Sequence, residues 1–258
     1  GGERLATRSG NLPLSGLTVV ESCRRIQGPL AGHLLASLGA KVIRVEPPGG
    51  DSLRGMPPMA EGRSARFDAL NRLKTVIEID LKSFAGQAQL KELVRDADVF
   101  LHNWAPGKAT EFGLAKGDLL QVQPALIYAY AGSWGSDSDA PSLPGTDFMA
   151  QAWTGVASRI AAASGTRGGT LFTALDVLGG AVAAQGITAA LFGRFVANAG
   201  GSVYTSLAGA ASLLCTDVLE AAISGGDVSP SVAGCGVFAT ADGLLAVHYG
   251  CGRSRTLL

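Results

Sequence analysis

Short runs of apolar, largely β-branched residues recur along the first half of the chain, separated by longer segments with helical spacing. Such runs are typical of strands that are buried on both faces. The pattern predicts five strands, at residues 17–22, 40–46, 75–81, 98–103 and 125–132. The first two strands and the helix between them occupy about thirty residues, which predicts a right-handed βαβ unit with parallel strands.

Helical patterns lie between these strands and dominate the second half of the chain. Pro29 opens an apolar helical segment that ends at Gly39, as Pro in a first turn and Gly after a last turn often do. The remaining predictions are a helix at 86–97, a mostly helical region at 147–195 with a Gly-rich break at 165–169, a strand that becomes a helix at 201–215, and a β-hairpin at 236–250.

Alternating strands and helices predict an α/β fold, a doubly wound, mostly parallel Rossmann-like sheet followed by the beginning of a second, smaller domain. We expect an N-terminal extension at 1–13, a large α/β domain at 14–222, and a linker with the start of the small domain at 223–258. Open parallel sheets bind ligands beyond the carboxyl ends of their strands. The loop 47–67 follows such an end, and loops of its length are often functional.

Composition excludes some classes of partner. The 258 residues are 47% hydrophobic, with 21 basic and 21 acidic side chains and no basic run, so we expect neither a nucleic-acid nor a membrane partner. The long apolar helix near 177–196 is interrupted by glycines and Arg194, which favours a core helix over a membrane span. Four cysteines without metal-ligand spacing indicate reduced thiols in a cytoplasmic protein, with no metal: Cys23, Cys215, Cys235 and Cys251.

The glycine motifs of nucleotide-binding sheets are missing. After the first strand the chain reads "CRRIQGPLAG", where a dinucleotide-binding loop would have GxGxxG. The sequence contains no Walker A, HExxH or GxSxG motif. A nicotinamide-dependent or nucleoside-triphosphate-dependent enzyme is therefore not expected.

One carboxylate stands in an otherwise apolar stretch. Asp176 lies in "TLFTALDVLGGAVAAQG", and burying an unpartnered charge is costly. The pattern by itself allows two interpretations. Asp is a good helix N-cap whose charge suits the positive end of the helix dipole. Alternatively, Asp176 is a reactive carboxylate with a perturbed pKa.

Several stretches together resemble the type III CoA-transferases, the family of formyl-CoA transferase and carnitine CoA-transferase. They occur in the family's order from Gly16 to about Val247: "LGAKVIRVEPPGGDSLR", "NRLKTVIEIDLK", "HNWAPG", "LPGTDFMAQAWTGV" and "LFTALDVLGGAVAAQGITAAL". The resemblance implies transfer of CoA from an acyl-CoA to a carboxylic acid acceptor, with coenzyme A as substrate and no metal. It makes 14–222 a CoA-binding catalytic domain.

The resemblance also implies roles for particular residues. Asp176 would attack the thioester to give an acyl-aspartyl anhydride and then an aspartyl-CoA thioester, with Gln27 close by; a solvated loop residue is the alternative for Gln27. Asn103 and Trp104 would line the CoA channel, or else be a turn residue and a core Trp. Four basic residues on strand ends or loops are candidate phosphate ligands, with solvated surface charge as the alternative: Arg44, Arg54, Arg72 and Lys74.

Two departures from the family pattern bear on function. Racemases of the superfamily have His where this chain has Thr146, which argues against racemisation. Family members continue well beyond Leu258, so we expect a homodimer or a piece of a larger polypeptide, with the helices at 176–215 near the contact. The alternatives to a transferase are an acyl-CoA isomerase, racemase or lyase, and a non-catalytic CoA-binding or assembly module.

Overall fold

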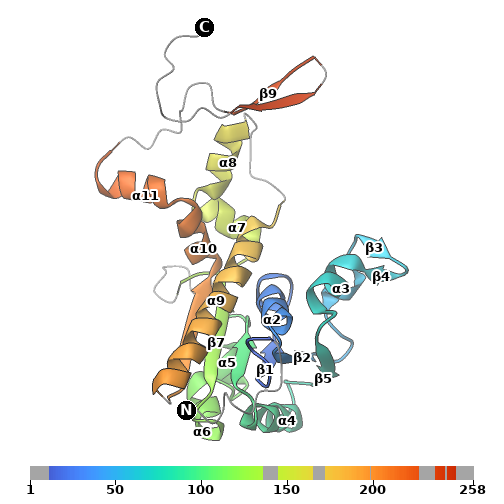
Figure 1. Cartoon of the computed structure of the whole chain (residues 1–258). Coiled ribbons are helices and arrows are strands. Elements are labelled where there is room, and N and C mark those ends of the chain that lie inside the picture. The colour runs from blue at the N-terminus through green and yellow to red at the C-terminus, as the bar shows by residue number, and fades with distance from the viewer. Residues whose placement is uncertain are drawn as a thin grey trace.

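The structure, a computed structural model, describes residues 12–135, 145–164, 172–197, 199–226, 236–241 and 243–247. Six parallel strands in these residues form one sheet in the order β5–β2–β1–β6–β7–β8 (Figure 1). The strands are β1 (Thr18–Ser22), β2 (Lys41–Glu46), β5 (Thr75–Glu78), β6 (Val99–His102), β7 (Ile127–Gly132) and β8 (Gly201–Ser206). Counted along the chain this is the order 3-2-1-4-5-6 of a doubly wound fold, so the predicted fold class is confirmed.

Helices cover both faces of the sheet because neighbouring strand residues point to opposite sides. Val19 belongs to a core shared with two helices, whereas Val20 belongs to a second core shared with two others. Both side chains are completely buried, as the continuous apolar runs predicted. The helices are α2 (Gln27–Ser37) and α9 (Ala174–Ala197) on the first face, and α4 (Phe84–Arg95) and α6 (Lys116–Val122) on the second.

The other elements of the described residues are short. They are η1 (Ser52–Gly55), β3 (Met59–Ala60), β4 (Arg63–Ser64), α3 (Ala65–Asn71), α5 (Lys108–Glu111), α7 (Asp147–Trp153), α8 (Val156–Ser164), α10 (Leu207–Leu214), α11 (Thr216–Ile223), β9 (Gly236–Ala239) and β10 (Leu244–Val247). The predicted strand-to-helix change is β8 followed by α10, and β9 and β10 form the predicted antiparallel hairpin.

The segment 47–67, expected to be a long loop, instead contains η1, the β3–β4 ribbon and the start of α3. The ribbon and α3 project to one side of the sheet (Figure 1). The segment 47–67 therefore has local structure of its own. Backbone pairing of Met59 with Ser64 supports it, and so does the Ser64 hydroxyl, which caps α3.

Helix α2 begins close to where the sequence places it and ends as predicted. Pro29 is the third residue of α2, within the first turn, where its missing N–H costs no hydrogen bond. Gly39 follows the helix with φ +101°, a conformation that suits glycine because it lacks a β-carbon. The chain can therefore turn directly from α2 into β2.

Two adjacent glycines bring α9 into contact with α2. A β-carbon at Gly180 would lie 2.7 Å from the Gln27 carbonyl oxygen and 3.0 Å from the Leu30 β-carbon. A β-carbon at Gly179 would lie 2.8 Å from the Gln27 side-chain amide. The glycines that interrupt the apolar helix pattern thus set the separation of two helices on the same face of the sheet.

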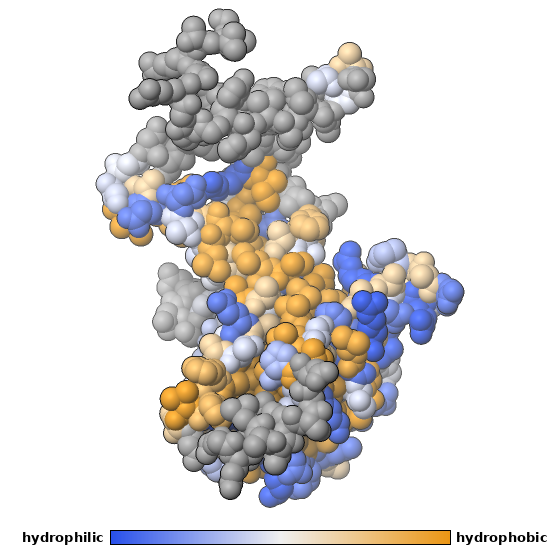
Figure 2. All heavy atoms as spheres, in the orientation of Figure 1, coloured by the Kyte–Doolittle hydropathy of each residue, from blue (hydrophilic) through white to orange (hydrophobic). Residues whose placement is uncertain are grey.

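Within the described residues, α9 is the one helix long and apolar enough to cross a membrane by length and composition. In the structure it lies on α2 and the sheet, as predicted for a core helix. Figure 2 shows apolar side chains gathered over α9 and its neighbours, and hydrophilic ones around α3. The large apolar residues that α7, α9 and α10 expose include Phe148, Trp153, Val177, Phe192 and Leu213.

Some predictions fall outside the described residues. These include the Gly-rich break at 165–169, the N-terminal residues 1–11, and two of the cysteines, Cys235 and Cys251. Cys23 and Cys215 are buried free thiols. The described residues contain no group of three or more His, Cys, Asp or Glu side chains placed to hold a metal ion.

The α2–α9 contact can be tested with two glycines of the same helix. We expect Gly180→Ala to destabilise the fold by about 1–3 kcal/mol, because the added methyl group must displace α2. Gly193→Ala is the matched control, since a β-carbon at Gly193 meets no heavy atom within 4 Å and Ala favours helix by about 0.5–1 kcal/mol. Urea unfolding measures both, and equal effects of the two changes would contradict the contact.

Candidate active site

The sheet order reverses between β1 and β6, and the ends of these two strands flank the crevice where doubly wound folds bind ligands. The loops after the strands are joined there by one side chain. The Arg24 N–H donates to the Asn103 side-chain oxygen, and the Asn103 amide nitrogen donates to the Arg24 carbonyl, each at 2.8 Å. Arg25, which follows, has φ +63°. Asn103 therefore clamps the β1 loop directly before α2.

Trp104 lies half-buried beside this clamp. Its indole N–H donates to the Ser22 hydroxyl at 3.1 Å, and its ring contacts Phe100 and Phe112 edge-on at centroid distances of 5.6 and 5.3 Å. Asn103 and Trp104 thus have structural partners, in line with the alternative of a turn residue beside a core Trp. A contact of either residue with CoA stays a prediction.

Gln27 is buried in the first turn of α2, with 4% of its surface exposed, so it is not a solvated loop residue. The side-chain amide of Gln27 satisfies its neighbours only with the nitrogen turned toward β7, and in that orientation it donates to the carbonyl oxygens of Ala131 at 3.0 Å and Gly132 at 3.3 Å. The same amide faces Gly179 of α9. Because Gly179 lies one helical turn after Asp176, the structure brings these two predicted site residues into one region.

Asp176 is the third residue of α9, and its own backbone N–H is capped by another carboxylate. That N–H donates to Asp147 Oδ2 at 2.7 Å. Asp147, buried in α7, also accepts a hydrogen bond from Gln151, which in turn donates to the Phe172 carbonyl at 3.0 Å. Asp176 is therefore not the N-cap of α9, which begins at Ala174, but it lies in the first turn, where its charge suits the helix dipole as the first interpretation expected.

The surroundings of Asp176 oppose its ionisation. Burial raises the pKa of its carboxyl group, and the negative charge of Asp147 raises it further. The positive charges of Arg25 and Arg66 lower it, and the pKa is about 7. A carboxylate that is more basic than usual is also a better nucleophile, and strongly perturbed pKa values are common at catalytic positions.

The position that carries His in the superfamily's racemases has a structural role here. Thr146 precedes α7, and its hydroxyl accepts a hydrogen bond from the Met149 N–H at 3.5 Å. A hydroxyl in this place caps a helix and is a poor base at neutral pH. The structure thus supplies no imidazole at this point.

A buried ion cluster occupies the Arg44 position that sequence reasoning assigned to phosphate binding. The Arg44 guanidinium donates to Glu21 at 2.5 Å, Asp51 at 2.5 Å and Glu46 at 3.0 Å, and its side chain has no exposed surface. Burial by itself would lower the pKa of Arg44, but these carboxylates outweigh it and raise the pKa. All of the guanidinium's nitrogens are committed within the protein.

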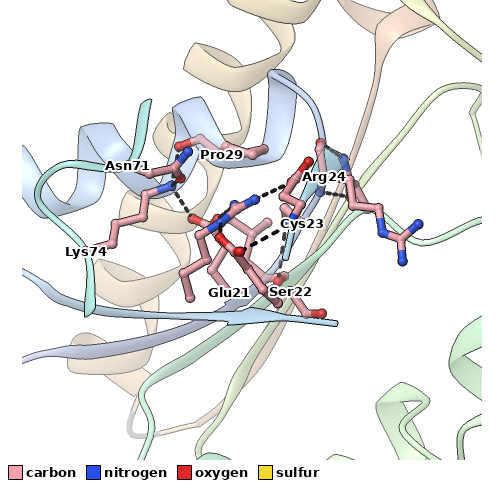
Figure 3. A network of polar contacts seen from close by, with 12 residues as sticks. Glu21, Ser22, Cys23, Arg24, Pro29, Asn71 and Lys74 are labelled. Carbon is pink, nitrogen blue, oxygen red and sulfur yellow. Dashed lines mark hydrogen bonds and ion pairs between the residues drawn. The ribbon is translucent and has the colours of Figure 1, made fainter. Parts of the chain in front are cut away.

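Lys74 is committed in the same way. Its ammonium group donates to Glu21 at 2.7 Å, the Pro29 carbonyl at 2.7 Å and the Asn71 side-chain oxygen at 2.9 Å (Figure 3). Its side chain is completely buried, and burial lowers its pKa while Glu21 opposes that shift. The burial and pairing of Arg44 and Lys74 argue against the phosphate-binding role predicted for them.

The other two predicted phosphate ligands remain accessible. Arg54 has 45% of its side chain exposed, although it donates to Glu46 at 2.8 Å and lies 4.0 Å above the Phe67 ring. Arg72 is exposed at the end of α3. Their contact with CoA phosphates stays a prediction.

Sequence reasoning missed three residues whose charges act on the pKa of Asp176. Asp147 stands in the "TDF" motif that carried part of the resemblance, but its distance of 29 residues from Asp176 hid the contact. Arg25 and Arg66 lie in stretches that offered no pattern, since isolated arginines in loops usually indicate solvated charge. Their relation to Asp176 depends on how β1, α3 and α9 come together.

A doubly wound sheet, with a carboxyl group of raised pKa in the first turn of a helix packed on it, is the arrangement of an α/β enzyme domain. The model of CoA-transferase family III matches residues 14–255, nearly the whole chain. The chain belongs to this family, which confirms the resemblance seen in its sequence.

Individual relatives agree with this assignment. The chain is 35% identical over 185 residues to the probable fatty acyl-CoA transferase Rv3272 of Mycobacterium tuberculosis, covering 70% of this chain and 47% of that protein. It is 32% identical over 253 residues to the succinate–glutarate CoA-transferase of Agrobacterium fabrum, covering 92% and 63%. A crystal structure of an aspartate-to-alanine mutant of Rv3272 matches with a TM-score of 0.82 and 30% identity, covering 92% and 63%. The chain thus spans about half to two thirds of these relatives' length.

Asp147 acts on Asp176 in two ways, through its negative charge and by accepting a hydrogen bond from the Asp176 N–H. Two variants of Asp147 separate these effects. We expect Asp147→Asn to lower the pKa of Asp176 below 7, because the negative charge goes while an oxygen remains to accept the Asp176 N–H. Gln151 can rotate to accommodate the new amide, since its side-chain oxygen has no hydrogen-bond partner among the described residues. Carboxyl-carbon NMR against pH measures the pKa.

Asp147→Ala serves as the comparison, because it removes the cap as well as the charge. We expect both variants to lower the pKa of Asp176, but only Asp147→Ala to lose stability by about 0.5–2 kcal/mol through the missing cap. An unchanged pKa in Asp147→Asn would show that the charge of Asp147 does not act on Asp176.

The raised pKa of Asp176 also makes the stability of the fold depend on pH. Since the folded protein holds this proton more tightly than the unfolded chain, stability falls as pH rises from the ordinary carboxyl pKa toward 7. We expect Asp176→Asn to be more stable than the original chain above pH 7, by up to about 4 kcal/mol and less where water screens the charge, and equally stable near pH 3. Urea unfolding across pH tests this, and a pH-independent difference would contradict it.

Proposed function

We propose that this domain transfers coenzyme A from an acyl-CoA donor to a carboxylic acid acceptor, with Asp176 as the nucleophile. The observation that carries the proposal is a half-buried carboxyl group of pKa about 7 in the first turn of α9, next to the crevice of a CoA-transferase family III domain. The succinate–glutarate relative, whose name specifies two carboxylic acids, supports this class of substrate.

In the first half of the reaction, the ionised Asp176 carboxylate attacks the donor's thioester carbonyl. The carbon–sulfur bond breaks, CoA leaves as thiolate, and a mixed acyl-aspartyl anhydride forms. The thiolate then attacks the Asp176 carbonyl of the anhydride and releases the donor acid as a carboxylate. The enzyme now holds CoA as an aspartyl thioester.

The second half repeats these steps in reverse. The acceptor carboxylate attacks the aspartyl thioester and displaces CoA thiolate, which attacks the acceptor's carbonyl and releases the Asp176 carboxylate. The overall reaction replaces one CoA thioester by another of similar energy, so no additional energy source is needed. Buried apolar surroundings support this chemistry by keeping water from the anhydride.

The neighbouring residues have supporting roles in this proposal. Gln27, fixed against β7 and α9, borders the site of the reacting carbonyl. Asn103 and Trp104, at the end of β6, border the path of the pantetheine arm, and Arg54 and Arg72 lie further out for the phosphates. Thr146, where racemases have His, favours transfer over isomerisation.

We also propose that the exposed apolar surface over α9 and α10 is covered in the whole protein, either by a second copy or by another part of a longer polypeptide. Phe192 and Leu213 are among the exposed side chains that support this proposal, with 68% and 58% of their surface accessible. Contiguous apolar surface of this kind is typical of protein interfaces.

Mass spectrometry after incubation with an acyl-CoA tests the mechanism. We expect a hydroxylamine-sensitive acyl or CoA adduct on Asp176, forming faster as pH rises through about 7 because only the carboxylate attacks. Asp176→Asn should form no adduct, whereas Asp68→Asn, which changes an exposed carboxylate paired with Arg63, should form it normally. An adduct that persists in Asp176→Asn would refute the assignment.

A further inference from the structure

Gln151 is a buried polar residue of α7 that takes no part in the proposed mechanism. It lies one helical turn after Asp147, and only 1% of its surface is exposed, compared with 3% for Asp147. Burying an amide is costly unless the amide is hydrogen-bonded. The contacts of this side chain therefore indicate what it does.

The amide nitrogen of Gln151 joins two points at the beginning of α9. It donates to the Phe172 carbonyl oxygen at 3.0 Å and to Asp147 Oδ1. Phe172 lies two residues before the helix, and its carbonyl also accepts the Ala174 N–H at 2.9 Å. The other oxygen of Asp147, Oδ2, accepts the Asp176 N–H at 2.7 Å. One side chain of α7 thus binds the segment before α9 and the carboxylate that caps Asp176.

A second donor fixes the orientation of the Asp147 carboxylate. A carboxylate with a single hydrogen bond can rotate about its last side-chain torsion, which has broad minima. Gln151 removes this freedom, because it follows four residues later on the same face of α7 and binds the oxygen that the Asp176 N–H does not use. The carboxylate is then held with Oδ2 toward α9.

The hydrogen bonds of Gln151 are all made by its nitrogen. The side-chain oxygen is buried and has no hydrogen-bond partner among the described residues. An apolar side chain of the same length would fill the same space but could bind neither acceptor. The hydrogen-bond donor is therefore the part of Gln151 on which the start of α9 depends.

The helices that pack against α9 carry few other charges. They are α2, α7 and α10 (Figure 1). Helix α10 has no charged residue, and the titratable side chain of α2 is His33, whose pKa is lowered by burial and by nearby basic residues. The titratable residues of β7 and β8 are tyrosines. Arg25 and Arg66 act on Asp176 from other elements, so Asp147 supplies the negative charge that acts on it from the helices packed on α9.

We propose that Gln151 is a positioning residue, which orients the first turn of α9 and the carboxyl group of Asp176 through Asp147 and the Phe172 carbonyl. The inference rests on the proposed function, in which that carboxyl group is the nucleophile. A nucleophile must approach the thioester carbonyl in a defined direction, so a small displacement of its helix slows the reaction. Gln151 acts without touching CoA or the acyl group.

Gln151→Met tests this role, because methionine is similar in length but donates no hydrogen bond. We expect the pKa of Asp176 to fall below about 7, since the Asp147 charge is no longer held in place. Carboxyl-carbon NMR measures this pKa without catalysis. Gln121→Met, which changes an exposed glutamine of α6, is the control and should leave the pKa unchanged.

The rate of adduct formation gives a second readout of the same variant. At a pH where Asp176 is ionised in both proteins, we expect Gln151→Met to form the adduct on the order of tenfold more slowly. The acyl-CoA concentration for half-maximal rate should change by less than about twofold, because Gln151 does not bind the ligand. A lower rate with an unchanged pKa of Asp176 would indicate a role in folding alone and would contradict the proposal.

A double variant shows whether Gln151 acts through Asp147. In Asp147→Asn the negative charge is already absent, so adding Gln151→Met should lower the pKa of Asp176 no further. Additive decreases in the pKa would overturn the proposal.

The unsubstituted chain allows a measurement that does not depend on the folding of any variant. The side-chain amide resonance of Gln151 should shift as Asp176 ionises, with a midpoint of about 7, because Asp147 joins the two residues. A resonance that does not respond to this ionisation would refute the coupling. If the unsubstituted chain forms no adduct, the proposed function fails, and the two NMR measurements decide the role of Gln151 by themselves.

Discussion

The carboxylate of Glu21, buried at the end of β1, is the group on which the arrangement of the crevice depends. One of its oxygens binds Arg44 of β2, and the other binds Lys74, which also reaches α2 and α3. A buried charge is tolerated only when it is paired and hydrogen-bonded, and losing one partner from such a cluster costs on the order of 3–5 kcal/mol. Because each charge here needs the others, the strands and helices around the crevice are held in one arrangement.

The same buried contacts help to position α9, which carries Asp176. Lys74 fixes the start of α2 through the Pro29 carbonyl, and Gln27 in that first turn lies against Gly179 of α9. The glycine pair of α9 lets the two helices approach closely enough for this contact. The position of Asp176 relative to the crevice therefore follows from close helix packing at one end and a buried ion cluster at the other.

The charged residues near the crevice divide by burial into two groups. Arg44 and Lys74 are buried in ion pairs with carboxylates inside the protein and stabilise the fold. Arg25 and Arg66 are exposed, and their positive charges lower the pKa of Asp176, whose ionisation is opposed by burial and by the charge of Asp147. A negative ligand in the crevice has access to the second group, whereas Arg44 and Lys74 have no exposed side-chain surface and already pair with carboxylates. The region thus combines a carboxyl group of raised pKa with exposed arginines whose positive charges act on it.

The sequence by itself determined the strands of the main sheet and its principal helices and singled out one unusual carboxylate, because these depend on local patterns. Apolar runs specify buried strands, Gly39 specifies the end of a helix, and Asp176 stands out as a charge within an apolar stretch. Tertiary structure decided which residues become partners. The cap of Asp176 comes from Asp147, 29 residues away, and the role of Arg44 depends on carboxylates from β1, β2 and the segment after β2. Burial and long-range pairing decide what a charge does, and neither can be read from its immediate neighbours in the chain.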